Sequence, residues 1–168
     1  MKLVTVSQMK AIEKEADAGG LTYDQMMENA GAGLADIILN LFIDDVEPEA
    51  VGLVGPGNNG SDTLVALSTL ATKGWKASAY LIKRKKDALV RQFVEAGGKV
   101  LSAAGFEELA GAIETADIFL DGVLGTGIKL PLKKDVADVL SEINDILDSL
   151  DQGPLIIAAK ASPGNEGR

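Results

Sequence analysis

The chain has 168 residues, of which 46% are hydrophobic, and it carries a formal net charge of -9 at pH 7. This size and apolar content predict a single domain over residues 1–168 with one sizeable core, and the negative charge argues against nucleic acid or an anionic membrane as a partner. The chain contains no histidine and no cysteine, which excludes disulfides, thiol nucleophiles, Ser-His-Asp triads and zinc sites built on His or Cys.

Any general acid or base must therefore be Asp, Glu, Lys or Tyr, and any bound cation must be a hard one held by oxygen ligands. The N-terminal sequence has no apolar segment typical of a signal peptide, and no stretch approaches the ~18 apolar residues of a membrane span. We accordingly expect no membrane association and a cytoplasmic location.

Two helices are predicted at the N-terminus. The first begins after Ser7 as its N-cap and ends at Gly19, with an apolar face formed by Met9, Ile12 and Ala16. The second begins with a capping box of Thr22 and Gln25.

Gly31 and Gly33 lie inside the second predicted helix. Each costs about 1 kcal/mol relative to alanine, which suggests that another backbone or a ligand comes close to the helix there, with ordinary packing as the alternative.

From about residue 50 onward, short apolar runs alternate with helical stretches five times. This alternation predicts an α/β fold, a three-layer Rossmann-like arrangement with a mostly parallel sheet. The predicted strands are Ala50–Val54, Ala77–Ile82, Lys99–Leu101, Ile118–Leu120 and Leu155–Ala158.

A glycine-rich segment follows the first of these strands. Gly55, Gly57 and Gly60 have the GxGxxG spacing between a predicted strand and a predicted helix, which is the context of dinucleotide-binding turns. The N–H groups of the following helical turn favour an anion. The pattern predicts a ligand-binding loop, with a ligand-free turn as the alternative.

The residues around these glycines differ from an ordinary dinucleotide fingerprint. Asp62 lies in the first helical turn, where a carboxylate repels a pyrophosphate, and Asn58 and Asn59 add side-chain amides. The acidic residue expected after the second strand is replaced by the basic run Lys83 to Lys86, which we interpret as a solvated strand end. The loop is predicted to bind polar groups or a cation as well as phosphate.

A second polar loop follows the fourth strand, where Asp121 leads into a glycine-rich turn. Asp121 is either a cap for this turn or a site residue. In the strand order 3-2-1-4-5 the first and fourth strands are neighbours, and ligands bind at the carboxyl ends of such strands. We therefore expect one crevice to contain Asn58, Asn59, Asp62, Asp121 and the amides of Gly125 to Gly127.

Four segments of the chain resemble a known family. VSQMKAIEKEA, MMENAG, GPGNNGSD and DGVLGTGIKLP occur in the order and approximate spacing of the NAD(P)H-hydrate epimerases, the YjeF N-terminal domains, over most of the chain from Val6 to Pro131. The resemblance implies a Rossmann-like homodimer that repairs nicotinamide nucleotides by interconverting the R and S forms of hydrated NADH and NADPH. It also implies a bound potassium ion (K+).

The resemblance further implies site residues by their place in these segments. Asn59 and Asp121 would help to hold K+. The substrate would be contacted by a first group of residues, Asn58, Asn59, Gly60, Ser61 and Asp62. A second group would line the nucleotide phosphates: Gly125, Thr126, Gly127, Ile128, Lys129, Leu130 and Pro131. The catalytic acid or base is not assigned; Asp62 and Asp121 are the candidates.

Several positions depart from the family pattern. Ser61 and Thr63 stand where the family usually has glycine, and Leu130 stands where it has an arginine, with Lys129 beside it as a substitute cation for phosphate.

After the fifth strand the family pattern VDIPSG supplies a substrate-binding Asp and a potassium-binding Ser, and here Lys160 and Pro163 occupy those positions. With the chain ending at Arg168, we expect a C-terminal portion that is either incomplete or diverged.

These departures leave two alternatives to an active epimerase. One is a catalytically silent nucleotide-binding or protein-interaction domain of the same fold, which Lys160 and Pro163 favour. The other is a conventional NADP-binding protein that recognises the 2′-phosphate with Lys83 to Lys86, against which Asp62 argues.

Overall fold

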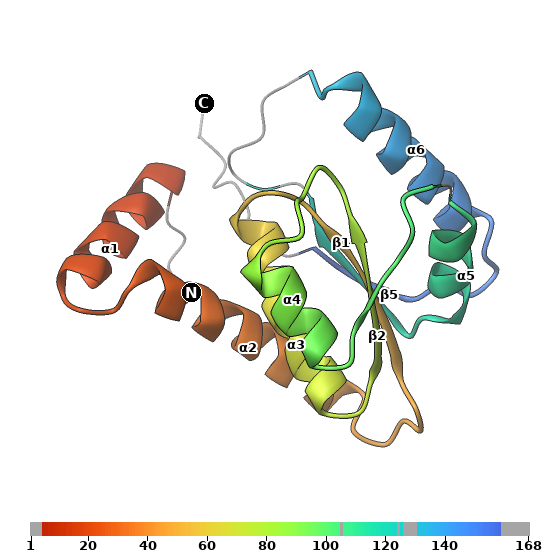
Figure 1. Cartoon of the computed structure of the whole chain (residues 1–168), viewed down its shortest axis with the longest axis horizontal. Helices are drawn as coiled ribbons and strands as arrows, with labels where there is room; N and C mark the ends of the chain where they lie inside the picture. Colours follow the sequence, from red (N-terminus) through yellow and green to blue (C-terminus); the bar gives the residue numbers. More distant parts are fainter. Residues whose placement is uncertain (1–4, 105, 124, 126–130, 159–168) are drawn as a thin grey trace.

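The computed structural model describes residues 5–104, 106–123, 125 and 131–158 (Figure 1). In chain order their elements are α1 (Val6–Ala18), α2 (Tyr23–Leu41), β1 (Glu49–Val54), α3 (Asn58–Thr72), β2 (Lys76–Leu81), α4 (Ala88–Glu95), β3 (Lys99–Val100), α5 (Glu107–Thr115), β4 (Ile118–Gly122), α6 (Lys134–Asp148) and β5 (Leu155–Ala158). The five predicted strands and the helices between them are confirmed.

The strands form one sheet in the order β3-β2-β1-β4-β5, and all neighbouring pairs are parallel. The predicted strand order is thus confirmed. At the carboxyl end of β1, Val54 is in register with Leu81 of β2 on one side and with Gly122 of β4 on the other. The loops that follow β1 and β4 therefore start side by side at the same edge of the sheet.

The helices cover both faces of the sheet, which gives the three layers that the sequence predicts. Helices α2, α3 and α4 lie on one face, and α5 and α6 lie on the other (Figure 1). Helix α3 is the centre of the first layer, because it contacts β1, β2 and β4 as well as α2 and α4.

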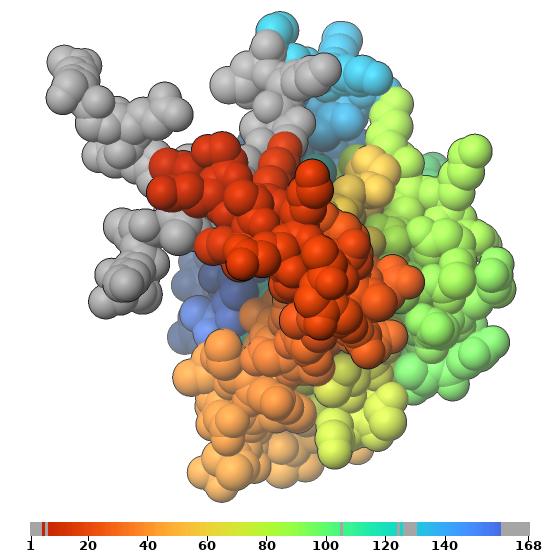
Figure 2. Space-filling model, turned by 90° about the vertical axis from the view of Figure 1, so that its left-hand side faces the viewer, coloured from red at the N-terminus to blue at the C-terminus, as the bar shows by residue number. Residues whose placement is uncertain are grey.

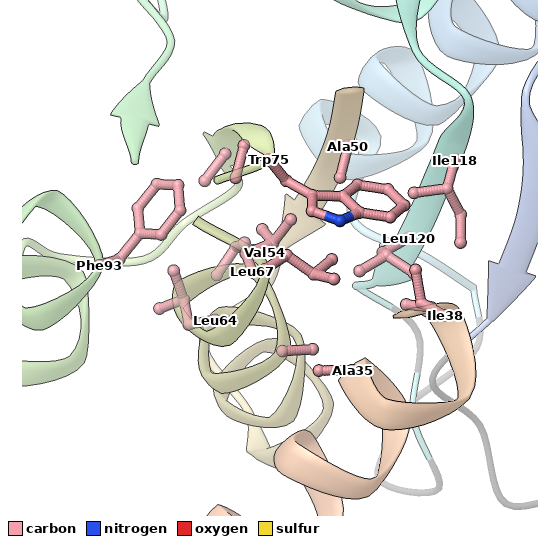
Figure 3. Packing of buried hydrophobic residues seen from close by; sticks show 14 of the residues in the cluster. Ala35, Ile38, Ala50, Val54, Leu64, Leu67, Trp75, Phe93, Ile118 and Leu120 are labelled. Carbon is pink, nitrogen blue, oxygen red and sulfur yellow. The ribbon is translucent and has the colours of Figure 1, made fainter. Parts of the chain in front are cut away.

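The core on this first face anchors α3. Leu64, Leu67 and Leu70 of α3 are fully buried and, with Phe93 of α4 and Ile38 of α2, belong to one apolar cluster against the sheet (Figure 3). Each side chain of this kind contributes about 1.5–3 kcal/mol when fully buried. The helix that follows the glycine-rich loop is therefore firmly fixed on the sheet.

The second face has a separate core. Leu53 and Phe119 of the sheet pack against Leu109 and Ile113 of α5 and Ile143 of α6. Because β1 contributes to both clusters, it is buried on both faces, as expected for the central strand of a doubly covered parallel sheet.

The N-terminal caps confirm one prediction and correct another. Thr22 and Gln25 form the predicted capping box of α2, but the N-cap of α1 is Thr5 and not Ser7. The Thr5 side chain accepts a hydrogen bond from the Gln8 N–H at 3.3 Å, and Gln8 Oε1 accepts one from the Thr5 N–H at 2.8 Å. Thr5 has a glutamine three residues later, which completes the box, whereas Ser7 has Lys10 at that position.

Helix α1 lies at the surface, next to α2 (Figure 2). Met9 and Ile12, on its predicted apolar face, are 38% and 51% exposed, so this face does not join the core. None of the helices in the described ranges combines the length and apolarity needed to cross a bilayer.

The two glycines inside α2 have different surroundings. A Cβ at Gly31 would lie 2.4 Å from Val65 Cβ and 2.7 Å from the Asp62 carbonyl oxygen of α3, whereas a Cβ at Gly33 would meet nothing within 4 Å. The predicted close approach of another backbone is confirmed at Gly31 and wrong at Gly33. Gly31 allows α2 to pack directly on the first turns of α3.

We predict opposite effects for the two alanine substitutions in this helix. Gly31→Ala should lower the free energy of unfolding by about 1–3 kcal/mol, because the added methyl group has no room. Gly33→Ala should raise it by up to about 1 kcal/mol, because alanine is the better helix former. Urea unfolding of the two variants measures both effects, and equal stabilisation by both would show that the α2–α3 contact is loose.

Candidate functional site

The β1–α3 loop depends on glycine for its shape. A Cβ at Gly60, in the first turn of α3, would lie 2.1 Å from the Gly55 carbonyl oxygen, so no other residue fits without a shift of the backbone. The N-cap of α3 is Gly57, which provides no side-chain hydrogen bond to the helix. The first N–H groups of α3 therefore lack a side-chain cap from this residue and can serve a bound anion.

The segment after β4 packs equally closely against this loop. The Gly55 N–H donates to the Gly122 carbonyl at 3.2 Å, and a Cβ at Gly122 would lie 2.3 Å from Thr63 Oγ1 of α3. One residue earlier, the half-buried Asp121 accepts a hydrogen bond on Oδ1 from the Val123 N–H at 2.9 Å. This bond orients the Asp121 carboxylate at the end of the strand, which is the turn-capping role considered from sequence.

The two loops meet at Asn59 and Gly125. A Cβ at Gly125 would lie 3.0 Å from Asn59 Cγ and 3.0 Å from Asn59 Oδ1, so the Asn59 amide lies directly against the second loop. Asp121 lies at the same edge of the sheet, in register with Leu53 near the end of β1. The predicted convergence of the loops is confirmed for Asn59 and Gly125, with Asp121 at the same edge of the sheet.

The other predicted substrate-binding residues differ in exposure. In the first loop Asn58 is exposed, Gly60 is buried, and Ser61 and Asp62 are half-buried. In the second loop Pro131 is exposed. The remaining predicted residues lie outside the described residues: Thr126, Gly127, Ile128, Lys129 and Leu130, together with Lys160 and Pro163.

Asp62 has unusual electrostatic surroundings. Burial, and to a smaller extent the nearby negative charge of Glu13, together raise the pKa of its carboxyl from 3.8 to about 6. Glu13 belongs to α1, so the surface helix contributes to the environment of the site. A carboxyl group with this pKa changes its protonation state close to neutral pH.

The basic run contains a residue whose role the sequence did not reveal. Lys85 and Lys86 are exposed as predicted, and Lys83 forms an ion pair with Asp135 of α6. The Arg84 side chain, however, is only 5% exposed. Its Nη1 donates to the Gly55 carbonyl at 3.0 Å and its Nη2 to Ser61 Oγ at 3.2 Å, so the interpretation of the run as a solvated strand end is wrong for Arg84.

The opposite end of the sheet carries pairs of opposite charge. A hollow of about 480 Å³ at the amino ends of β1, β2 and β3 is lined by Glu49, Lys76, Lys99 and Glu108, among others. Lys76 pairs with Glu49 at 3.1 Å and Lys99 with Glu108 at 3.8 Å. This end of the sheet is opposite the loops. Within the described ranges, no cluster of three or more His, Cys, Asp or Glu side chains is arranged for a metal ion.

A family model described as YjeF-related protein N-terminus matches residues 23–159. The chain belongs to this family. The match includes both loops of the site and every strand of the sheet, so the site described above is that of a YjeF-related N-terminal domain.

The curated relatives of this YjeF-related domain have names that refer to one substrate. It is 30% identical to a bifunctional NAD(P)H-hydrate repair enzyme Nnr of Thermofilum pendens, over 99% of this chain and 32% of the relative. It is 29% identical to an NAD(P)H-hydrate epimerase of Ajellomyces capsulatus, over 84% of this chain and 60% of the relative. The domain thus spans between about a third and 60% of the length of these two proteins.

A solved structure supports the fold. The crystal structure of yeast ynu0 matches with a TM-score of 0.78 and 21% sequence identity, over 95% of this chain and 70% of that chain.

The raised pKa of Asp62 predicts a pH-dependent gain of stability in Asp62→Asn. Because the folded pKa of about 6 exceeds the ordinary 3.8, the charged carboxylate destabilises the folded state as pH rises through this window. Asparagine removes that cost, so the variant should be more stable by about 1–3 kcal/mol at pH 7 and equal to the parent below pH ~4. Urea unfolding between pH 4 and 7 tests this, and a difference that does not vary with pH would contradict it.

Proposed function

We propose that this domain epimerises hydrated NADH and NADPH, interconverting the R and S forms at the ring carbon that bears the hydroxyl. The observation on which the proposal rests is the contact of Asn59 with Gly125, which joins a glycine-rich helix N-terminus to a second polar loop. The names of the relatives from Thermofilum pendens and Ajellomyces capsulatus supply the substrate.

The geometry suits a phosphorylated ligand with a reactive ring. The start of α3 offers backbone N–H groups and the positive end of the helix dipole to a phosphate group. Asn59 offers amide groups beside Gly125, which can hold the ligand in one orientation. The half-buried Asp62 lies one turn into the same helix.

We assign proton transfer to Asp62. Protonated Asp62 gives its proton to the hydroxyl group of the hydrate, the C–O bond breaks and water leaves, which produces an iminium ring. Water then adds to the opposite face and returns a proton to the carboxylate, so the protein is unchanged after one turnover. A pKa of about 6 suits this role, because a group that both gives and takes a proton works best near the ambient pH.

Potassium is the cofactor that we propose for the site. Asp121 and Asn59 offer carboxylate and amide oxygens at the same edge of the sheet, and hard cations bind to oxygen ligands of this kind. When bound, K+ would supply positive charge beside the ligand. The homodimer implied by the family resemblance and the cytoplasmic location expected from the N-terminal sequence remain predictions.

The main test measures epimerisation directly. The purified chain, supplied with one epimer of hydrated NADPH, should restore the equilibrium mixture faster than buffer alone, and kcat/KM should fall about tenfold per pH unit above pH ~6 as Asp62 loses its proton. Asp62→Asn should lower kcat by about a hundredfold or more. Chromatographic separation of the epimers measures both quantities.

A matched control is Asp36→Asn, which removes the same charge from an exposed position of α2 and should leave the rate unchanged. Nucleotide binding without turnover would support the catalytically silent alternative. Failure of both binding and turnover in the presence of millimolar K+ would refute the proposal.

The potassium site has its own test in Asp121→Asn. This variant keeps an oxygen acceptor for the Val123 N–H but removes the negative charge that attracts a cation. In the parent chain, KCl should raise the melting temperature more than choline chloride of the same ionic strength, through binding to the folded state. The variant should lose most of this difference. An equal rise of the melting temperature with KCl in parent and variant would show that Asp121 does not bind the cation.

A further inference from the structure

The buried Arg84 is the feature of the site that the proposed chemistry does not use. Arginine is almost never fully buried unless it is paired, and here the guanidinium has three partners: the Gly55 carbonyl, Ser61 Oγ and Asp87 Oδ2, the last at 2.8 Å. Two of these partners belong to the glycine-rich loop and the first turn of α3. The third lies on the same connection as Arg84, directly before α4.

Asp87 fixes the position of Arg84. It is the N-cap of α4, where Oδ1 accepts a hydrogen bond from the Val90 N–H at 3.1 Å while Oδ2 pairs with Arg84. Val90 and Phe93 of the same helix are buried in the core. The guanidinium is therefore attached to a helix whose position is set by apolar packing, and from there it reaches across to the β1–α3 loop.

Stability alone does not account for this arginine. Its Nε is buried and has no hydrogen-bond partner among the described residues, which is a cost that an apolar side chain of similar size would avoid. An arginine instead restrains the geometry of its partners, because its planar guanidinium donates hydrogen bonds to acceptors at fixed angles. Two of its acceptors, the Gly55 carbonyl and Ser61 Oγ, lie in the loop and the helix start that we propose for ligand binding.

We propose that Arg84 is a positioning residue, which holds the β1–α3 loop in the conformation that binds the nucleotide. By engaging the Gly55 carbonyl, it restrains a residue that packs against Gly60 and whose own N–H donates to the Gly122 carbonyl. By engaging Ser61, it holds the first turn of α3 relative to α4. This second bond depends on the Ser61 hydroxyl, which a glycine at this position would lack.

The effect on ligand binding rests on the proposed function, but the effect on the loop does not. Two variants of the full chain separate these two effects. Arg84→Met removes the positive charge and the guanidinium donors at similar side-chain volume. Arg84→Lys keeps the positive charge but lacks the planar guanidinium. Arg91→Gln, an exposed arginine on α4, is the matched control for loss of one positive charge.

We expect Arg84→Met to raise KM for hydrated NADPH by about tenfold while kcat changes by less than about threefold, because a misplaced loop weakens binding before it alters the chemistry. Amide hydrogen exchange should become faster over residues 55–62 and remain unchanged in β2 and β4. Arg84→Lys should show smaller changes of the same kind, and Arg91→Gln should match the parent in both measurements.

Hydrogen exchange that is unchanged over residues 55–62 in Arg84→Met would overturn the inference, and so would exchange that is faster throughout the sheet, which indicates a general structural role. If Arg84→Met fails to fold, Arg84→Lys decides by the same criteria. If the parent chain neither turns over nor binds NADPH, the proposed function fails, and the hydrogen exchange still decides whether Arg84 orders the loop.

Discussion

The parallel pairing of β1 with β4 is the interaction on which the site depends. These strands are separated by α3, β2, α4, β3 and α5 in the chain, yet their last residues, Val54 and Gly122, are in register. Because a parallel sheet aligns the carboxyl ends of its strands, the two loops leave it at one point. The contact of Asn59 with Gly125 follows from this placement, since neither loop has to cross the sheet to reach the other.

Close packing around α3 turns this adjacency into a defined geometry. Gly60, Gly122 and Gly31 each occupy a place where an added Cβ would come within 3 Å of another residue. They bring the first turns of α3 against the β1 loop, the end of β4 and α2 respectively. Buried leucines on the same helix resist its movement away from the sheet, so the helix N-terminus has little freedom to change its distance from the second loop.

The fold and the outline of the site could be predicted from the sequence because both depend on repeating patterns. Alternating apolar runs and helical stretches specify a parallel sheet, and glycines after two strands mark the loops. The sequence does not distinguish Gly31 from Gly33, however, because only the position of α3 in the fold makes one of them closely packed and leaves the other exposed. Similarly, four consecutive basic residues are most often solvated, and the burial of Arg84 depends on where α4 places Asp87, which no local pattern contains.

The absence of histidine and cysteine leaves a chemical difficulty, because an ordinary aspartate is fully ionised at neutral pH and is a poor proton donor. Burial resolves it at Asp62. Partial removal from water disfavours the carboxylate, and the neighbouring Glu13 on α1 adds to the effect, so the group retains its proton at higher pH than an exposed aspartate does. The same burial lowers the stability of the folded state at neutral pH. The apolar packing of α3 offsets that loss of stability. The helix can therefore keep the Asp62 carboxyl group partly buried although burial is unfavourable for its charged form.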